Sequence, residues 1–590
     1  MPAMNSAVDA WLQQALAHHR SGDLAQAGAA YQRLLAQQPQ HADATHLLGF
    51  LRHQQGDSAR AAALIEHAIA LSPGVAVYHA NLAIVLLAQG QADRAEAHWL
   101  RAHWLDPQSA ETCNNLGARC SARGQHAQAL AWFEQAVALQ PALAMAHNNL
   151  GLACAALGQP AQAVRHFQQA VACGPDDADA HNNLGSAWAG AGRHDASVAC
   201  YRQSLALRPD HAATLSNLVT SLTRLGQADE GLALARQAVA LQPGLASAWT
   251  GLGTVLQHAG AVAEAHGALA QALALDPQAP AARLNLALCL LLQGDFAAGW
   301  PAYEGRFQAP DFQPLAALPP CAVWQGEPLA GRSLLVQAEQ GLGDTLQFAR
   351  YLPLLKARGA ALTLQCQAPL LRLMQTLPGQ PALVSCAQPP PATDFVVSAM
   401  SLPLRLGTTL GNIPAGQPYL QAEPQALAAW QQRLAGTAGG LRVGLAWQGS
   451  PLHAADRYRS MPLATFDALA DLDSVQFVSL QRDPRPEPAA ALAARLHDPT
   501  DALVDMADMA ALIGALDLVI SVDTAVCHLA GALGKPVWVL LHAGPDFRWL
   551  MGRDDSPWYP TARLFRQQRL GDWGPVIGRV RAALAVRAAA

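Results

Sequence analysis

Small and apolar residues recur at helical spacing through the first half of the chain, in units that repeat every 34 residues. Most units place glycine in one apolar stretch and alanine in the next, and small side chains let two helices approach closely. We therefore expect pairs of helices, with Tyr31, Phe133, Phe167 and Tyr201 filling the gaps between neighbouring pairs. Prolines close eight successive units at Pro39, Pro73, Pro107, Pro141, Pro175, Pro209, Pro243 and Pro277.

A 34-residue period closed by proline is typical of tetratricopeptide repeats, in which each helix pair buries its apolar face by stacking on its neighbours. The pattern predicts an α-helical tetratricopeptide-repeat superhelix over residues 8–310, with eight full units and a partial ninth that ends early at Pro310. A proline-rich linker is expected over residues 311–330.

A row of asparagines occupies one position of the first helix of most units, and Gly251 interrupts it once. Asparagine is a poor residue for a helix interior, so a repeated one needs a reason. One interpretation is an amide ladder that binds an extended peptide; the other is that each amide bonds a neighbouring helix, or that the row records recent duplication. The row consists of Asn81, Asn115, Asn149, Asn183, Asn217 and Asn285.

The row resembles the repeat superhelix of eukaryotic protein O-linked N-acetylglucosamine transferase, in which such a ladder lines the concave face and holds acceptor protein. This resemblance implies a protein or peptide partner on the concave face of the repeats.

From residue 331 the pattern changes to short apolar runs that alternate with amphipathic segments. Alternating strands and helices predict parallel sheets and an α/β fold. One series begins at SLLVQ and continues with ALTLQC, and a second begins at LRVGLAW and continues with VQFVSL, LDLVISV and PVWVLL. We expect two Rossmann-like lobes, over residues 331–440 and 441–590, whose core does not depend on the repeats.

Three polar segments follow predicted strands or lie in loops between them, where α/β proteins place their ligands. Gly341, Gly343 and Asp344 open a helix in the first lobe, although glycines at such turns also serve packing. In the second lobe, Asp523 and Thr524 lie between a strand and a helix, where either a ligand contact or a helix cap would explain them.

The third segment is the loop DRYRS, in which Arg457 and Arg459 could clamp a diphosphate or could simply be solvated. In the later loop HAGPDFRWLMGRDDSPWYP, Arg548, Trp549 and Trp558 could frame a nucleotide base or sugar. The competing interpretation, lobe packing, is favoured for the two tryptophans.

The segments EQGLGDTLQFARY, WQGSP, DRYRS and DTAVCHLAGALGKPVWVLL together resemble glycosyltransferase family 9, the heptosyltransferase group, over about residues 331–585. The resemblance implies the GT-B fold, an inverting reaction and a sugar nucleotide held mainly by the second lobe. It identifies Asp344 with the catalytic aspartate, and Arg459, with Arg457 beside it, with the phosphate-binding position.

Backbone amides near Thr524 and Ala525 would hold the same diphosphate, and Asp523 would contact hydroxyl groups or cap the helix. His528 is expected to be structural. The resemblance implies neither a metal nor a cofactor beyond the nucleotide-sugar donor.

Composition supports a folded protein and excludes some partners. The 590 residues are 51% hydrophobic and 14% charged, with a net charge of -5, and no basic cluster favours nucleic acid. The sequence shows no stretch long enough to span a membrane and no signal-like start, so we expect a cytoplasmic location. Its ten cysteines form no CxxC pair, which argues against a metal site or disulfides.

The sequence therefore predicts an inverting, metal-independent glycosyltransferase, transferring a hexose or a heptose, whose repeats present a protein acceptor or partner. A non-enzymatic repeat scaffold with inactive lobes and a transferase acting on a lipid-linked glycan are the alternatives. Asp344 favours the enzyme, since a lost activity would have allowed another residue there.

Overall fold

The computed structural model describes residues 2–309, 312, 314–435, 440–451, 453, 455–482, 485 and 490–589. Its backbone divides into two compact units, one ending at Pro209 and one beginning at Asp210. We call them the leading unit and the core unit. Pro310, the expected last proline of the repeats, lies outside the described residues.

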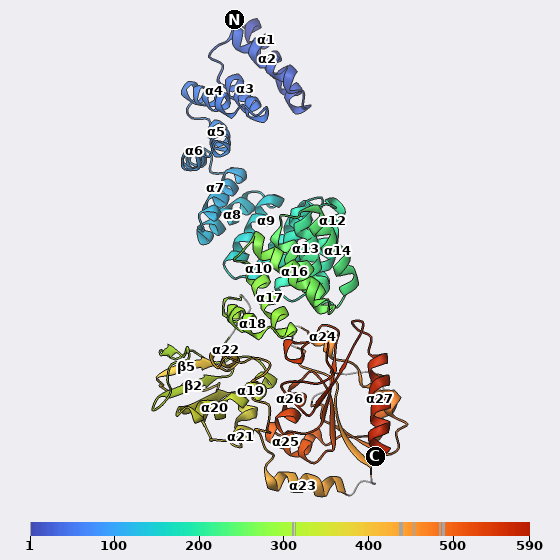
Figure 1. The fold of residues 1–590 in the computed structure, drawn as a ribbon. Coiled ribbons are helices and arrows are strands. Elements are labelled where there is room, and N and C mark those ends of the chain that lie inside the picture. The colour runs from blue at the N-terminus through green and yellow to red at the C-terminus, as the bar shows by residue number, and fades with distance from the viewer. Residues whose placement is uncertain are drawn as a thin grey trace. The chain divides into compact units, whose positions relative to one another are not determined.

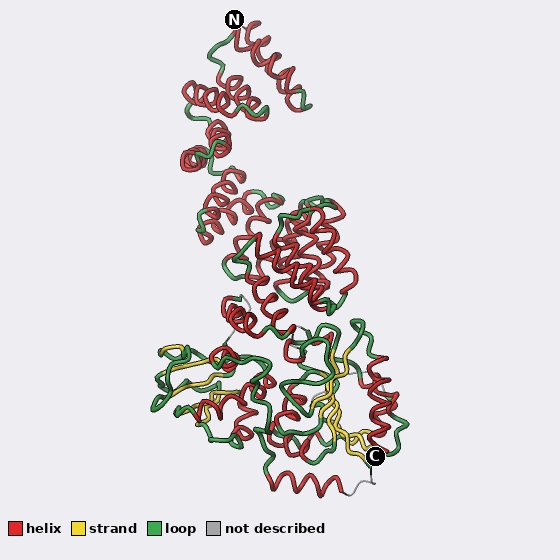
Figure 2. Tube along the Cα trace, viewed as in Figure 1, coloured by secondary structure: helices red, strands yellow, loops and turns green. Residues whose placement is uncertain are grey.

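The leading unit consists of helix pairs (Figures 1 and 2). Its helices are α1 Pro2–Arg20, α2 Leu24–Gln37, α3 Ala42–Gln54, α4 Ser58–Leu71, α5 Ala76–Ala88, α6 Ala92–Leu105, α7 Ala110–Ala122, α8 His126–Leu139, α9 Ala144–Ala156, α10 Pro160–Cys173, α11 Ala178–Gly190 and α12 His194–Leu207. The pairs continue in the core unit as α13 Ala212–Arg224, α14 Ala228–Leu241, α15 Ala246–His258, α16 Val262–Leu275, α17 Pro280–Gln293 and α18 Phe296–Tyr303.

Glycines set the spacing of the two helices within a pair. A Cβ atom added to Gly117 would lie 2.6 Å from the ring of Phe133, and Gly151 and Gly185 meet Phe167 and Tyr201 in the same way. The small residues have the predicted role. The aromatic rings, however, cover the glycine of their own pair, because they lie on the second helix directly opposite it.

The turn between the helices of each pair also requires glycine. Nine glycines at 34-residue intervals, from Gly22 to Gly294, have φ between +71° and +87°, a conformation that other residues adopt only with strain. Between pairs, the repeat prolines contribute their carbonyl oxygens: Pro141 and Pro175 accept hydrogen bonds from His147 and His181 at 3.0 and 2.9 Å.

Two lobes with parallel sheets follow the repeats. The amino-terminal lobe contains the strand order β1-β5-β2-β3-β4, with β1 Ala322–Val323, β2 Ser333–Gln337, β3 Ala361–Cys366, β4 Ala382–Ser385 and β5 Phe395–Ser398. Its helices are α19 Leu342–Phe348, α20 Leu352–Ala357, α21 Leu371–Met374 and α22 Leu402–Arg405. Helix α23 Pro424–Ala435 then precedes the first strand of the carboxy-terminal lobe.

The carboxy-terminal lobe has the strand order β11-β10-β9-β6-β7-β8. The strands are β6 Leu441–Ala446, β7 Val475–Ser479, β8 Leu496–His497, β9 Leu518–Val522, β10 Val537–Leu541 and β11 Ala562–Arg566. Its helices are α24 Asp456–Arg459, α25 Met506–Gly514, α26 Ala525–Ala532 and α27 Gly574–Ala589. The predicted fold class is confirmed: helical repeats precede two α/β lobes.

The core of the lobes continues into the last repeats, contrary to the expectation that it would be independent of them. Trp300 of α18 is 2% exposed, and its ring lies 6.5 Å from that of Phe348 in one lobe and 5.7 Å from that of Phe547 in the other. These residues share one hydrophobic cluster. The expectation was wrong because the aromatic residues of the ninth pair pack on the lobes.

Part of the predicted linker also belongs to the amino-terminal lobe. Ala322 and Val323 form an edge strand against β5, and the buried Trp324 donates its backbone N–H to Val396 O at 2.8 Å. The boundaries predicted near residues 310, 330 and 440 remain predictions, since the compact units divide the chain elsewhere.

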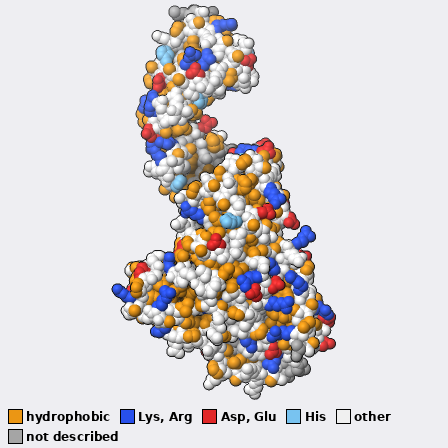
Figure 3. Space-filling model, viewed as in Figure 1, with side chains coloured by type: hydrophobic (Ala, Val, Ile, Leu, Met, Phe, Trp, Pro, Cys, Tyr) orange, Lys and Arg blue, Asp and Glu red, His pale blue; other side chains and the backbone are white. Residues whose placement is uncertain are grey.

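The charged side chains on one face and the lengths of the helices complete the description of the fold. On the face drawn in Figure 3, basic and acidic side chains of the described residues are intermingled. Among the described residues, every helix is too short or too polar to cross a lipid bilayer.

Candidate active site

The predicted site residues of both lobes lie where the strand order reverses. In the amino-terminal sheet, β2 lies between β3 and β5, and residues 338–344 follow β2. In the carboxy-terminal sheet, β6 and β9 are neighbours, and Asp523 follows β9 directly. Such switch points in parallel sheets open a crevice at the carboxyl ends of the strands, where ligands bind.

The segments that follow β2 and β9 meet through α19 and α26, which lie next to each other between the sheets (Figure 1). A Cβ atom added to Gly343 would lie 2.8 Å from Cδ2 of His528 and 3.5 Å from Cα of Ala525. Gly343 therefore permits the two helices to approach. This close packing is the alternative that the sequence analysis left open for the glycine pair.

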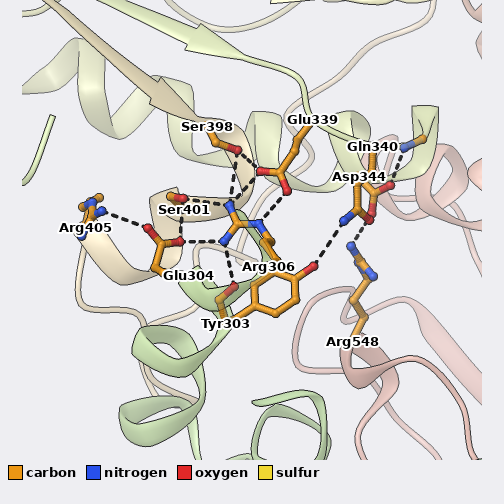
Figure 4. Close-up of polar contacts among 11 residues, drawn as sticks. Tyr303, Glu304, Arg306, Glu339, Gln340, Asp344, Ser398, Ser401, Arg405 and Arg548 are labelled. Carbon is orange, nitrogen blue, oxygen red and sulfur yellow. Dashed lines mark hydrogen bonds and ion pairs between the residues drawn. The ribbon is translucent and has the colours of Figure 1, made fainter. Parts of the chain in front are cut away.

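Asp344 lies at this junction and contacts both lobes (Figure 4). Its Oδ2 accepts a hydrogen bond from the backbone N–H of Gly341 at 2.7 Å, which closes the first turn of α19. Its Oδ1 forms an ion pair with Arg548 of the carboxy-terminal lobe. A single carboxylate thus joins a loop of one lobe to a guanidinium of the other.

Arg548 is buried between two carboxylates. Its side chain is 7% exposed, and Nη1 donates to Oδ1 of Asp546 at 2.6 Å. Burial alone would lower the pKa of Arg548, but the charges of Asp546 and Asp344 raise it above its ordinary value. The guanidinium is therefore a fixed positive charge beside Asp344.

Arg459 supplies a second positive charge at the end of β9. Its Nη1 donates to the backbone oxygen of Asp523 at 2.8 Å, and its Nε lies 3.3 Å from Oδ1 of Asp456. A Cβ atom on Gly449 would lie 2.7 Å from Nε of Arg459, so glycine in the WQGS turn makes room for this arginine.

Arg457 points elsewhere, although it is only two residues from Arg459. Its Cδ lies 3.2 Å from the position of a Cβ atom on Gly226, in the turn between α13 and α14. Residues i and i+2 lie on different faces of a helix, which explains the separation. The structure brings Arg459 to the site and places Arg457 beside the repeats.

Thr524 rather than Asp523 caps α26. The hydroxyl of Thr524 accepts from the N–H of Val526 at 3.3 Å, so the interpretation of Asp523 as the cap is wrong. Asp523 is 8% exposed, and its Oδ1 lies 3.6 Å from Nε2 of His528. Although burial would raise the pKa of Asp523, His528 and the charges of Arg459 and Arg548 hold it below its ordinary value.

His528 has the structural environment that the sequence analysis expected. Its Nδ1 lies 3.0 Å from the hydroxyl of Tyr559, and its ring stacks on Trp549 at 5.4 Å. Trp549 and Trp558 are 0% and 1% exposed, which confirms that both tryptophans serve packing.

Within the described residues, Asp523, Cys527 and His528 form one group of potential metal ligands. The thiol of Cys527 donates to Thr524 O at 2.9 Å, and burial raises its pKa well above the usual range. Two arginines already balance the charge of Asp523. A protonated thiol and nearby cations make this group a poor fit for a metal ion.

His453 is an exposed residue beside the predicted site that the sequence analysis did not consider. It lies in the loop between the WQGS turn and α24, and its Nδ1 accepts from the N–H of Ala455 at 3.1 Å. Desolvation of the ring and the charge of Arg459 lower the pKa of His453, while three carboxylates oppose the shift: Asp523, Asp546 and Asp344. Its electrostatic neighbours are thus those of the site.

The last repeat pairs also contact the carboxy-terminal lobe. The hydroxyl of Tyr458 donates to Thr223 O of α13, and its ring stacks on His258 of α15 at 5.0 Å. Burial lowers the pKa of His258 to about 4 and that of the neighbouring His542 to about 3, so both are neutral at pH 7. The repeats therefore support the loop that carries Arg459.

The asparagine row is half-buried along both units. The amides of Asn149 and Asn183 donate to Asn114 and Asn148 of the preceding pair at 2.9 Å each. Asn81 and Asn285 likewise bond His46 and Thr254, at 2.9 and 2.8 Å. For these four, bonding to a neighbouring pair is confirmed. Partner binding by the row, including Asn115 and Asn217, stays a prediction.

Family models match the helical repeats and part of the carboxy-terminal lobe. Tetratricopeptide-repeat models match residues 3–42, 12–76, 76–101, 119–158, 155–212, 217–266 and 259–305. Residues 474–548 match the model described as glycosyltransferase family 9 (heptosyltransferase). The chain thus combines tetratricopeptide repeats with a family 9 segment. That segment contains Asp523, Thr524 and Ala525, whereas Asp344 and Arg459 lie outside it.

Among curated proteins, Protein FlbA of Caulobacter vibrioides is 32% identical over 327 residues, which are 50% of this chain and 54% of FlbA. The chain thus spans about half the length of this relative. Solved structures resemble only part of this chain. The Cut9–Hcn1 complex of the APC/C gives a TM-score of 0.38 at 20% identity, over 48% of this chain and 55% of that one. PilW, a type IV pilus biogenesis factor, gives 0.33 at 23% identity, over 36% and 98%.

Proposed function

We propose that the two lobes form a GT-B glycosyltransferase that moves a sugar from a nucleotide diphosphate donor to an acceptor hydroxyl, with inversion and without a metal ion. The observation that carries the proposal is the position of Asp344. Its carboxylate lies at the lobe junction, paired with Arg548 and close to α26, and both Arg548 and α26 belong to the family 9 segment.

Asp344 is the proposed general base. An acceptor hydroxyl must lose its proton as it attacks the anomeric carbon, and a carboxylate within hydrogen-bond reach can take that proton. The bond from Gly341 fixes the orientation of the Asp344 carboxylate. Each carboxylate oxygen has two lone pairs, so both oxygens of Asp344 keep acceptor capacity beyond their present bonds.

Arg459 and Arg548 are the proposed partners of the diphosphate. Negative charge develops on the leaving group as the glycosidic bond breaks, and fixed guanidinium groups stabilise that charge. Backbone amides near Thr524 and Ala525, at the start of α26, would add donors. A diphosphate on Arg548 would compete with Asp344 for the same cation and so make that carboxylate a stronger base.

The repeats are proposed to bind the acceptor protein or a partner. Tetratricopeptide repeats stack into extended surfaces that suit polypeptide ligands, and the asparagine row offers amide groups along such a surface. The amide N–H groups of four of these asparagines already bond within the array, so their carbonyl oxygens are the groups proposed to accept from a peptide backbone.

A thermal-shift screen of ADP- and UDP-linked sugars first identifies a donor, because a bound donor raises the melting temperature. The test is then Asp344→Asn, measured in parallel with Arg459→Ala. Asp344→Asn should reduce kcat by about 10² or more, because general base catalysis contributes roughly 10² to 10⁴. Donor affinity by calorimetry should be unchanged or higher, since Arg548 is released. Arg459→Ala should weaken donor binding and also slow transfer.

Unimpaired transfer by Asp344→Asn would remove the catalytic assignment. A wild-type chain that neither binds any nucleotide sugar nor transfers one would instead favour the scaffold alternative.

A further inference from the structure

The end of the repeat array is bonded to the loop that carries Asp344. Arg306 lies in the 3₁₀ turn Glu304–Gln308 that follows α18. Its guanidinium donates to both oxygens of Glu339, from Nε to Oε1 at 2.6 Å and from Nη2 to Oε2 at 2.7 Å. Both side chains are 3% exposed. This is a buried, bidentate ion pair (Figure 4).

The surrounding groups complete the pair. Nη2 of Arg306 also donates to the hydroxyl of Ser401 at 2.9 Å, and Nη1 donates to Glu304 at 2.7 Å. Glu304 is held in turn by Arg405 at 2.9 Å, and the Ser398 hydroxyl donates to Glu339. Two arginines and two glutamates thus balance their charges in one network.

Glu339, Gln340 and Gly341 are consecutive, and each has its own support. Arg306 holds Glu339, while the side-chain amide of Gln340 donates to the hydroxyl of Tyr303 in α18 at 3.4 Å. The N–H of Gly341 donates to Asp344. The ninth repeat pair therefore fixes the two residues that precede the turn in which Asp344 lies.

We infer that Arg306 is a positioning residue for Asp344, which makes the last repeat pair part of the catalytic unit. This inference rests on the proposed function. Stability alone is a poor explanation for the pair, because replacing a buried ion pair with apolar residues is often neutral or stabilising. A bidentate pair, however, fixes the orientation of its partner, and a misplacement of about 1 Å can cost about 10²-fold in rate.

The test is the double variant Arg306→Met/Glu339→Leu in the full chain. It removes both charges, so no buried charge is left alone, and Glu304 keeps Arg405. We expect a Tm close to wild type, kcat reduced about tenfold or more, and unchanged donor affinity. Hydrogen exchange of the peptide spanning residues 338–346 should become faster, because Gly341 loses its fixed position.

A matched control is Arg581→Met/Asp471→Leu, which removes an exposed ion pair of 2.5 Å in the carboxy-terminal lobe. It should change none of the four measurements, which are Tm, kcat, donor affinity and hydrogen exchange at residues 338–346. Arg306→Lys, which keeps the charge and loses the bidentate geometry, gives a second test if the double variant does not fold. It should lower kcat and speed exchange at residues 338–346 while the chain stays folded.

Wild-type kcat and wild-type exchange in the folded double variant, or in Arg306→Lys where that variant is used, would overturn the inference. Asp344→Asn, measured in parallel, separates this failure from failure of the proposed function. If Asp344→Asn retains activity, the proposed function fails, and faster exchange in the Arg306 variants would still show that Arg306 positions the loop.

Discussion

The same helical turn has different surroundings in the two units of the chain. In the leading unit, no described atom lies within 4 Å of a Cβ built on the turn glycines Gly22, Gly56, Gly90, Gly124, Gly158 and Gly192. In the core unit, the equivalent position on Gly226 meets Arg457, that on Gly260 meets Ala543, and that on Gly294 meets Leu410. One repeat sequence thus forms free turns in one unit and docking points in the other.

A repeat can therefore serve as scaffold or as core, according to a few side chains. Gly544 shows how close the docking is, since a Cβ there would lie 1.9 Å from the backbone oxygen of Gln257 in α15. Phe296 and Trp300 stand where the preceding pair has Val262 and His266, and together with Tyr303 they fill the junction of the lobes. The last three pairs therefore belong energetically to the lobes.

The largest expected effect comes from cutting the chain at two different places. A fragment of residues 210–590 should fold, because it retains one compact unit. A fragment of residues 331–590 should be insoluble or molten, because it loses three buried aromatic side chains worth roughly 1.5 to 3 kcal/mol each and leaves Glu339 without Arg306. Soluble yield and circular dichroism melts check both, and a cooperative melt of the shorter fragment would contradict the shared core.

A smaller effect is expected when alanine replaces a turn glycine in each unit. Gly158→Ala should cost about 1 kcal/mol, the strain of a positive φ. Gly260→Ala should cost about 2 to 4 kcal/mol, because its Cβ would also lie 2.7 Å from the carbonyl oxygen of Ala543. Scanning calorimetry of the full chain measures both changes. Equal shifts would mean that the docking contact does not constrain the turn.

The smallest effect should come from the asparagine row. The bond between Asn149 and Asn114 lies within the leading unit and involves no residue of the lobes. Asn149→Ala removes a donor from the buried Asn114, a cost of about 1 kcal/mol that better helix propensity only partly offsets. Asn114→Ala/Asn149→Ala should recover the loss. Denaturant melts test stability, and a pull-down of partner proteins shows whether the row also binds them. Unchanged stability of Asn149→Ala would show that the bond from Asn149 to Asn114 does not stabilise the array.

Much of the architecture could be predicted because it is periodic. The 34-residue spacing defined the repeats, and the apolar runs at SLLVQ and LDLVISV became β2 and β9. The two-residue strand β1 was missed, since Ala322–Val323 lies among prolines and is too short for any pattern. The docking of the ninth pair was missed for a different reason: Trp300 and Tyr303 fit a repeat as well as they fit an interface.

The sequence predicted individual residues of the site but not the contacts between them. Motifs located Asp344, Arg459 and Thr524, all of which the structure brings to the lobe junction or to the end of β9. The partner of Asp344, Arg548, lies 204 residues further along the chain, and such a pairing leaves no local signal. The different directions of Arg457 and Arg459 were predictable, because a separation of two residues turns a helical side chain away.

The turn glycines have a consequence for how the gene can change. Residues 76–109 span one full period, so their deletion would join Val75 to Ala110, and both flanking residues already adjoin the start of a first helix. Recombination between such periods would lengthen or shorten the leading unit in steps of one helix pair and leave the contacts within the core unit untouched. A crossover that removed the period containing Gly260 would instead delete a docking point. The reach of the repeats and the integrity of the lobes can thus be inherited separately.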